Sequence, residues 1–491
     1  MNNIDYIGIQ AAMARLPSDH DASGAHRPTV SEIFTPRQHA FALDPDTPVV
    51  VGARGSGKSF WAGVLQHDDT RNFAALAYPQ VDLESVVVEA GYTGIASEGG
   101  VTSRNIDARV PAGQEEQQGF EFWQAVIMRA AKRATDPDTE QPTLRDLMTQ
   151  YSDPEDADRE LSRLDRHFAS ARKTLIVTFD ALDTISTEWK RSRKLLDALF
   201  EVIWSLRARR AIRGKVFIRP EQFNDETLRF VELPKLRSMR IELVWSKEDL
   251  YGMMFSQLSQ LAELKARRSL IALASEADAD YPADMRTWFR KRSLYADGAA
   301  QQRMMVCLAG LYMGRGAKKG GTYDWPYNHL GDAHGRVTPR SFMKLFAEAG
   351  KYPHTLSSQA ISADGIRHGL REASRVRVDQ LVLEYPWIKR AIAPLAGVTV
   401  PCDPTRIYEL WEETKTVETI LKAAKSQTTG FLPPFEFAKA ANPVEALALA
   451  MENIGVLSFR SDGRIDMPDL FRVAALMLKR GATPPLKNLS R

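Results

Sequence analysis

Eight consecutive residues have the types and spacing of a phosphate-binding loop. Residues 52–59 read Gly-Ala-Arg-Gly-Ser-Gly-Lys-Ser and follow the apolar run Pro48-Val-Val-Val. Glycines in this pattern let backbone N–H groups converge on the β- and γ-phosphates of a nucleotide, and the N-terminus of the following helix adds positive potential. The side chain of Lys58 is expected to reach the phosphates, and the hydroxyl of Ser59 is expected to ligate Mg²⁺. The pattern therefore predicts nucleotide binding by Gly52, Ala53, Arg54, Gly55, Ser56, Gly57, Lys58 and Ser59.

A second acidic motif lies farther along the chain. The apolar run Leu175–Phe179 ends at Asp180, and the sequence continues Ala-Leu-Asp183. An acid at the carboxyl end of a buried strand can enter the Mg²⁺ shell of a bound nucleotide, as in the Walker B motif. Buried strands often end in aspartate, so this interpretation depends on the loop upstream. With that loop present, Asp180 and Ser59 are the predicted metal residues.

Hydrolysis also needs a group that orients or deprotonates the attacking water. Many ATPases place a glutamate directly after the Walker B aspartate, but here that residue is Ala181. Asp183 is the nearest substitute, and Glu188 is a second, weaker one. Asp183 fits a helix N-cap equally well, because Thr-Ile-Ser-Thr follows it. No Asn-Lys-x-Asp sequence is present to read guanine, so ATP is favoured over GTP.

Several arginines are candidates for contact with the γ-phosphate. Arg219 ends the predicted strand Lys215–Arg219 and suits a sensor position, although a surface arginine before a turn is the competing interpretation. Arg340 lies in the first turn of a helix predicted to start after Thr338, from which a lid domain could bring it to the nucleotide; a surface role is again the alternative. A basic helix end supplies possible arginine fingers for a neighbouring subunit, or simply charge that suits a helix C-terminus: Arg209, Arg210 and Arg213.

These residues need a parallel sheet to bring them together. From about residue 46 apolar runs and helical patterns alternate, which predicts an α/β fold with helices on both faces of a parallel sheet. Residues 91–118 look like a polar insertion and 135–158 like an exposed excursion, with a helix over Phe120–Ala134 between them. The predicted strands are Val49–Gly52, Phe73–Tyr78, Ser85–Glu89, Thr174–Phe179, Lys215–Arg219 and Arg240–Trp245.

Beyond Trp245 the pattern becomes helical. We expect helices over Lys247–Lys265 and Ala299–Tyr312, and a different texture near the C-terminus. There a helix (Pro443–Ile454), two short strands around Ser461-Asp-Gly463 and a final helix (Pro468–Arg480) suggest a winged-helix-like module. The chain thus divides into an N-terminal appendage (1–40), a P-loop ATPase core (41–250), a helical lid and helical domain (251–430) and the winged-helix-like domain (431–491).

The composition is that of a globular protein. The 491 residues are 44% hydrophobic and 26% charged, and the net charge of +3 does not by itself argue for nucleic acid. No run is long and apolar enough to cross a membrane and no signal peptide is visible, so a cytoplasmic protein without membrane contact is expected. Cys307 and Cys402 are isolated and show no metal-type spacing.

Four segments together resemble bacterial P-loop ATPases of the AAA+/STAND and KAP type. They are residues 49–59, Phe-Asp-Ala-Leu-Asp183, the junction Leu243–Leu250 and Val-Thr-Pro-Arg-Ser341, and the resemblance spans roughly residues 35–350. It implies ATP and Mg²⁺ as cofactors, with Lys58 and Ser59 in the phosphate loop, Asp180 and Asp183 in Walker B, and Arg340 as the lid arginine. Such relatives couple ATP to a conformational switch or to oligomer assembly, and many act beside an effector in bacterial defence against phage.

Three functional hypotheses follow. The first is a regulatory Mg²⁺-ATPase, in a homo-oligomer or alone, that controls an effector protein encoded nearby. The second is a DNA-engaging motor or loader that uses the winged helix and the basic segments near 207–215 and 286–292. The third is a scaffold that holds ATP without hydrolysing it, which Ala181 makes credible. A small-molecule kinase shares the loop but usually lacks so large a helical tail.

Overall fold

The computed structural model describes residues 4–18, 27–95, 100–186, 188–223, 228–277, 293–353, 357–426, 433–438 and 441–484. The chain forms two compact units, one spanning Asp21–Val244 and the other combining Met1–His20 with Trp245–Arg491. We call them the sheet unit and the helical unit. This division differs from the four parts expected from the sequence, chiefly because the N-terminal segment groups with the helical unit. The basic segment 286–292 lies outside the described residues.

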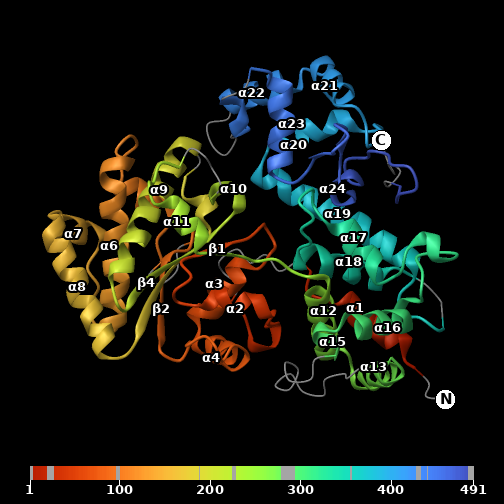
Figure 1. Cartoon of the computed structure of the whole chain (residues 1–491), viewed down its shortest axis with the longest axis horizontal. Coiled ribbons are helices and arrows are strands. Elements are labelled where there is room, and N and C mark those ends of the chain that lie inside the picture. The colour runs from red at the N-terminus through yellow and green to blue at the C-terminus, as the bar shows by residue number, and fades with distance from the viewer. Residues whose placement is uncertain are drawn as a thin grey trace. The chain divides into compact units, whose positions relative to one another are not determined.

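The sheet unit contains five parallel strands in the order β2-β3-β4-β1-β5 (Figure 1). Strand β1 lies between β4 and β5, so Val50 is in register with Phe217 on one side and Ile241 on the other. Since all strands are parallel, their carboxyl ends meet at one edge of the sheet. The strands are β1 (Val49–Val51), β2 (Val86–Tyr92), β3 (Thr174–Phe179), β4 (Ile212–Ile218) and β5 (Arg240–Glu242).

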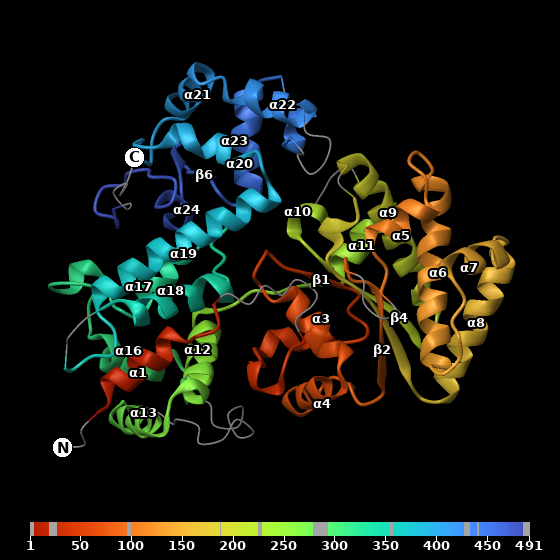
Figure 2. The same cartoon turned by 180° about the vertical axis from the view of Figure 1, so that it is seen from behind.

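Both faces of this sheet are covered by helices (Figures 1 and 2). Alternate strand residues point to opposite faces: Val49 and Val51 belong to one apolar cluster and Val50 to the other. The first cluster packs under α6 (Glu115–Thr135), α8 (Pro154–Ser170) and α9 (Trp189–Ser205), and the second under α3 (Lys58–Gln66) and α4 (Asp68–Ala77). The expected α/β fold with a parallel sheet is confirmed. The other helices of this unit are α2 (Ala40–Leu43), α5 (Ser103–Arg109), α7 (Leu144–Gln150), α10 (Pro220–Phe223) and α11 (Leu233–Ser238).

Two expectations for this unit were wrong. The segment Phe73–Tyr78 lies mostly in helix α4, whose first turn carries Asp68 and Asp69, as suits a helix N-terminus. Residues 135–158 are no simple excursion, because α7 and the start of α8 form there and α7 buries Leu144 and Leu147. The predicted insertion at residues 91–118 contains the end of β2, helix α5 and the first turn of α6.

Helix α1 (Tyr6–Ala14) packs within the helical unit. It buries Ile9 and Met13, and the backbone N–H of Asp5 donates to Ser269 Oγ at 2.9 Å. It is therefore not a separate appendage.

No helix among the described residues of the chain has the length and apolar character required to cross a membrane. The unit also contains α12 (Lys247–Leu261), α13 (Leu264–Glu276), α15 (Ser293–Ala296), α16 (Gly298–Ala309), α17 (Asp324–Leu330), α18 (Pro339–Lys351), α19 (Ala363–Glu384), α20 (Ile388–Ile392), α21 (Pro404–Glu413) and α22 (Thr416–Ser426).

The C-terminal part has the expected winged-helix-like order. Helix α23 (Pro443–Asn453) precedes an antiparallel pair, β6 (Ser458–Phe459) and β7 (Ile465–Asp466), and α24 (Asp469–Arg472) follows. The last helix is much shorter than the predicted Pro468–Arg480. The chain turns away after Arg472 because Leu476 has a positive φ of 58° and the buried guanidinium of Arg472 donates to the carbonyl of Met477 at 2.9 Å.

Candidate functional site

The phosphate-binding loop continues the backbone pairing of the sheet before it turns into α3. The N–H of Gly52 donates to the carbonyl of Ile218 at 3.0 Å, which fixes the start of the loop beside the end of β4. Gly57 precedes α3 with φ of 104°, a backbone conformation that L side chains rarely adopt. Helix α3 then begins at Lys58, so its N-terminus faces the loop.

Gly52 is enclosed by the loop that it starts. A Cβ added there would lie 2.3 Å from Ser56 Oγ and 3.1 Å from Lys58 Cγ. Any larger residue at position 52 therefore pushes on the loop itself. This close approach is what a cradle of backbone N–H groups around a phosphate requires.

Lys58 lies against the loop with its charge held by backbone carbonyls. Its Nζ donates to the carbonyls of Gly52 at 2.7 Å and Ala53 at 3.2 Å. Burial lowers the pKa of Lys58 to about 8, and the nearby Arg219 adds to this effect while Asp180 opposes it. A bound phosphate would offer the ammonium a stronger, charged partner than these carbonyls.

Asp180 and Ser59 meet beside Lys58. The Ser59 hydroxyl hydrogen-bonds the Asp180 carboxylate, which is only 7% exposed at the end of β3. Burial raises the pKa of Asp180 above its ordinary value, while the Ser59 bond and the charge of Lys58 act in the opposite direction. A hydroxyl and a carboxylate side by side form the oxygen set that Mg²⁺ takes from a protein when nucleotide phosphates and water supply the rest.

Asp183 and Arg219 form an ion pair. Arg219 Nη2 lies 2.5 Å from Asp183 Oδ2, and Arg219 Nη1 lies 3.9 Å from Glu221 Oε1. Asp183 does not cap a helix, because the N-cap of its short 3₁₀ turn is Ala181, which has φ of 54°. The charges of Arg219, Asp183 and Glu221 all influence the pKa of Lys58, so the pair lies near the loop.

The remaining predicted residues lie elsewhere. Glu188 is the exposed N-cap residue of α9. Two of the finger candidates, Arg209 and Arg210, precede β4, and Arg213 is its second residue, so all three lie at the opposite end of the strands from Asp180. Arg209 pairs with Asp158, Arg213 Nε lies 3.0 Å from Asp46 Oδ1, and Arg210 is exposed. Arg340 lies in the first turn of α18, whose N-cap Thr338 accepts a bond from the N–H of Ser341. Because Arg340 belongs to the helical unit, its lid role stays a prediction.

Sequence reasoning missed two contributors. Glu221 follows Arg219 and Pro220, and its proximity to the strand end was the available signal. His39 had no motif, yet it is fully buried and accepts a hydrogen bond from Trp61 Nε1 of α3 at 3.1 Å. With Nδ1 accepting, Nε2 carries the proton and donates to the carbonyl of Val244 at 3.1 Å. Burial lowers the pKa of His39 to about 4, so the ring is neutral.

The residues present fit ATP and Mg²⁺. The loop forms a cradle that a Cβ at Gly52 would fill, and Ser59 with Asp180 supplies an oxygen pair. Across the described ranges, no group of three or more His, Cys, Asp or Glu side chains is placed to hold a metal ion.

Comparisons with known proteins are sparse. No protein-family model and no curated protein matches the chain. The ORC2 protein of Aeropyrum pernix, solved in ADPNP–ADP complexes, aligns at 13% identity over 92% of this chain and 94% of its own, with a TM-score of 0.32. Cdc6p of Pyrobaculum aerophilum aligns at 11% identity over 94% of this chain and 97% of its own, with a TM-score of 0.31. At these TM-scores we base no inference on either likeness; the P-loop core is identified by its own strand order and loop.

Proposed function

We propose that the sheet unit binds Mg²⁺-ATP and hydrolyses it, and that the nucleotide state switches the protein between conformations that regulate a partner. The observation that carries this proposal is the convergence of Lys58, Ser59 and Asp180 at the carboxyl edge of the sheet. A partner effector, a homo-oligomer and a role in defence against phage follow from the resemblance to STAND and KAP ATPases, and they belong to the same proposal.

Each residue then has a chemical role. Lys58 and the loop N–H groups would hold the β- and γ-phosphates, and Ser59 with Asp180 would hold Mg²⁺, which neutralises charge on the phosphates when bound. Asp183 would orient the attacking water, since Arg219 engages its Oδ2 and its side chain is 40% exposed. Arg219 would hold that carboxylate in place and sense the γ-phosphate from the end of β4.

The test measures ATP binding and phosphate release for the wild type and three variants. Lys58→Ala should weaken ATP binding, whereas Asp183→Asn should keep binding and reduce turnover about 10²- to 10⁴-fold, the range for loss of a general base. Glu188→Gln is the matched control, because this exposed acid lies outside the cluster and should leave turnover unchanged. Absence of ATP binding by the wild type, with or without Mg²⁺, would refute the proposal.

A second candidate is a scaffold that retains ATP. It is favoured by Ala181, which occupies the position of the usual catalytic acid, and by the engagement of Asp183 with Arg219. This candidate predicts stoichiometric ATP binding and phosphate release that is equally low in the wild type and in Asp183→Asn. The same two assays therefore separate the two functions.

A further inference from the structure

The segment between α16 and α17 is a glycine-rich hairpin. Residues 311–321 read Leu-Tyr-Met-Gly-Arg-Gly-Ala-Lys-Lys-Gly-Gly and contain no acidic residue. The N–H of Met313 donates to the carbonyl of Gly320 at 2.9 Å, and the N–H of Thr322 donates to that of Leu311 at 3.2 Å, so the base of the hairpin is closed. We call this segment the basic hairpin.

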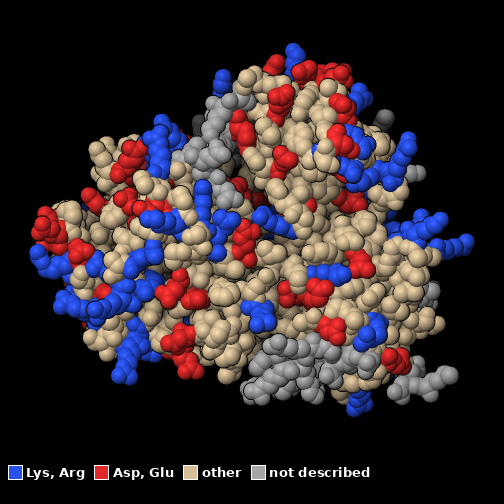
Figure 3. Space-filling view, in the orientation of Figure 1, with Lys and Arg blue, Asp and Glu red and all other residues tan. Residues whose placement is uncertain are grey.

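The charges of the basic hairpin are exposed. Arg315, Lys318 and Lys319 are all solvent-exposed, and none forms an ion pair with another residue that the structure describes. Figure 3 shows Lys and Arg side chains gathered at the right-hand edge, over the segment that joins α16 to α17 in Figure 1. Such a cluster of exposed, unpaired cations creates a local positive potential despite the small net charge of the chain.

Helix α19 supports the base of the hairpin and carries a further cation, Arg371. Arg367 donates to the carbonyl of Met313 and binds Asp364 Oδ1 at 2.6 Å, which fixes the hairpin base to the helix. A Cβ on Gly314 would lie 3.1 Å from Lys319 Cγ and 3.6 Å from Arg367 Nη2, so the hairpin packs closely against the end of this arginine. One turn along α19, Arg371 donates to the carbonyl of Pro484 at 3.2 Å, a neutral partner that leaves its charge available.

We propose that the basic hairpin binds the phosphodiester backbone of a nucleic acid. Three cations within five residues match a closely spaced row of phosphates, and the glycines around them let backbone N–H groups approach phosphate oxygens. A protein partner would need an apolar centre to its interface, whereas the hairpin offers only the half-exposed Leu311 and Tyr312 at its base. Contacts of this kind read charge, so binding should be independent of base sequence.

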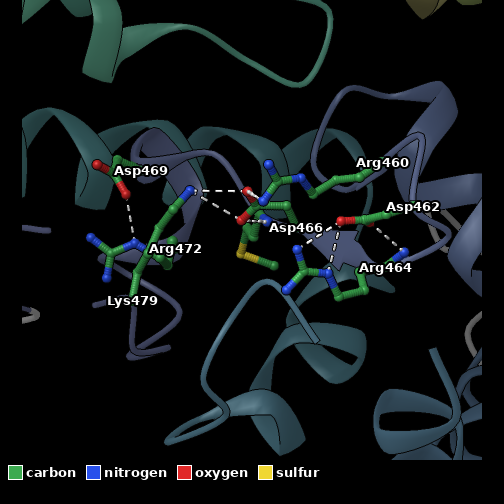
Figure 4. A network of polar contacts seen from close by, with 8 residues as sticks. Arg460, Asp462, Arg464, Asp466, Asp469, Arg472 and Lys479 are labelled. Atoms are coloured by element: carbon green, nitrogen blue, oxygen red, sulfur yellow. Dashed lines mark hydrogen bonds and ion pairs between the residues drawn. The ribbon is translucent and has the colours of Figure 1, made fainter. Parts of the chain in front are cut away.

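The winged-helix-like hairpin is a poor alternative site, because its charges neutralise one another. Arg464 pairs with Asp462 at 2.7 Å, and Asp466 receives Lys479 at 3.0 Å and lies 3.8 Å from Arg460 (Figure 4). Phosphates that approached these cations would compete with carboxylates already in place. The described cations of the wing thus already have carboxylate partners, while those of the basic hairpin form no ion pair with a described residue.

The experiment measures binding of the full chain to a labelled duplex of about 20 base pairs as a function of salt. Three phosphate contacts should make wild-type affinity fall at least about 40-fold between 50 and 200 mM salt. The triple variant R315A/K318A/K319A should lower the slope of log affinity against log salt by about 2.7. The matched control K265A/K422A/K425A removes three exposed cations elsewhere in the helical unit and should keep most of the slope.

Four outcomes would overturn the proposal. They are no duplex binding by the wild type at 50 mM salt, equal loss in both triple variants, a strong preference between two unrelated duplex sequences, and polyglutamate binding as tight as duplex binding. Thermal unfolding and ATP binding are measured on the same samples, and both should be unchanged in R315A/K318A/K319A. The proposal is independent of ATP hydrolysis, so failure of one does not decide the other.

Discussion

Replacing Gly52 with alanine tests how tightly the phosphate-binding loop is packed. The added Cβ would lie 2.3 Å from Ser56 Oγ, closer than real Cβ atoms come to any neighbour. Overpacking of this kind costs about 1–3 kcal/mol, which corresponds to a drop of about 2–12 °C in the unfolding midpoint for a unit of this size. If the loop shifts to relieve the contact, its N–H groups leave their positions, and ATP affinity should fall by a similar free energy, about 5- to 150-fold.

A second substitution at Ser56, the residue that the added Cβ would contact, provides the decisive variant. Ser56→Ala removes Oγ, so the double variant G52A/S56A should recover at least half of the lost stability and affinity. Differential scanning fluorimetry without nucleotide and titration with a fluorescent ATP analogue measure the two effects. Gly331→Ala is the control, because its Cβ would meet nothing closer than 3.7 Å and its φ is −65°. A G52A variant with wild-type stability and affinity, or a double variant no better than the single one, would refute the reasoning.

Three further predictions concern buried or partly buried charges. Because the pKa of Lys58 is lowered to about 8, its positive charge is lost above that pH, so ATP affinity should fall about tenfold per pH unit there, while Lys58→Arg should flatten the profile. Lys215 is fully buried and its pKa is lowered to about 7, so above pH 7 the unfolded chain binds more protons than the folded one and stability rises with pH. In urea unfolding, the free energy of unfolding of the wild type should rise by about 2 kcal/mol more between pH 7 and 9 than that of Lys215→Met. Parallel pH profiles of the two proteins would contradict this. Arg191→Met leaves the buried Glu115 without its 2.5 Å partner and should cost about 3–5 kcal/mol of stability, which R191M/E115M should largely restore; an equal loss in both variants would contradict it.

The sequence predicted the parts of the site that depend on local pattern. A strand, a glycine loop and a helix in succession identify Gly52–Ser59, and an apolar run identifies the strand that ends before Asp180. The same reasoning failed for Phe73–Tyr78, since a short apolar run does not distinguish a strand from a buried helix face; the acidic first turn of α4 favours the helix.

Contacts between residues far apart in the chain could not be predicted from the sequence. It named both Asp183 and Arg219, but their ion pair arises only because β3 and β4 are neighbours in the sheet. His39 was missed for the same reason, because its partners Trp61 and Val244 come from segments far apart in the chain. The basic hairpin was hidden by the small net charge, which averages over carboxylates that lie elsewhere.

The neutral ring of His39 has a mechanical consequence. It connects α3, the helix that begins at the phosphate-binding loop, to Val244, the last residue of the sheet unit before the chain enters the helical unit. Gln38 donates to the same carbonyl of Val244, so two side chains tether the point at which the chain leaves the unit. A displacement of α3 is therefore transmitted to Val244 through the hydrogen bonds of the His39 ring. Since the ring titrates only near pH 4, this linkage persists at neutral pH.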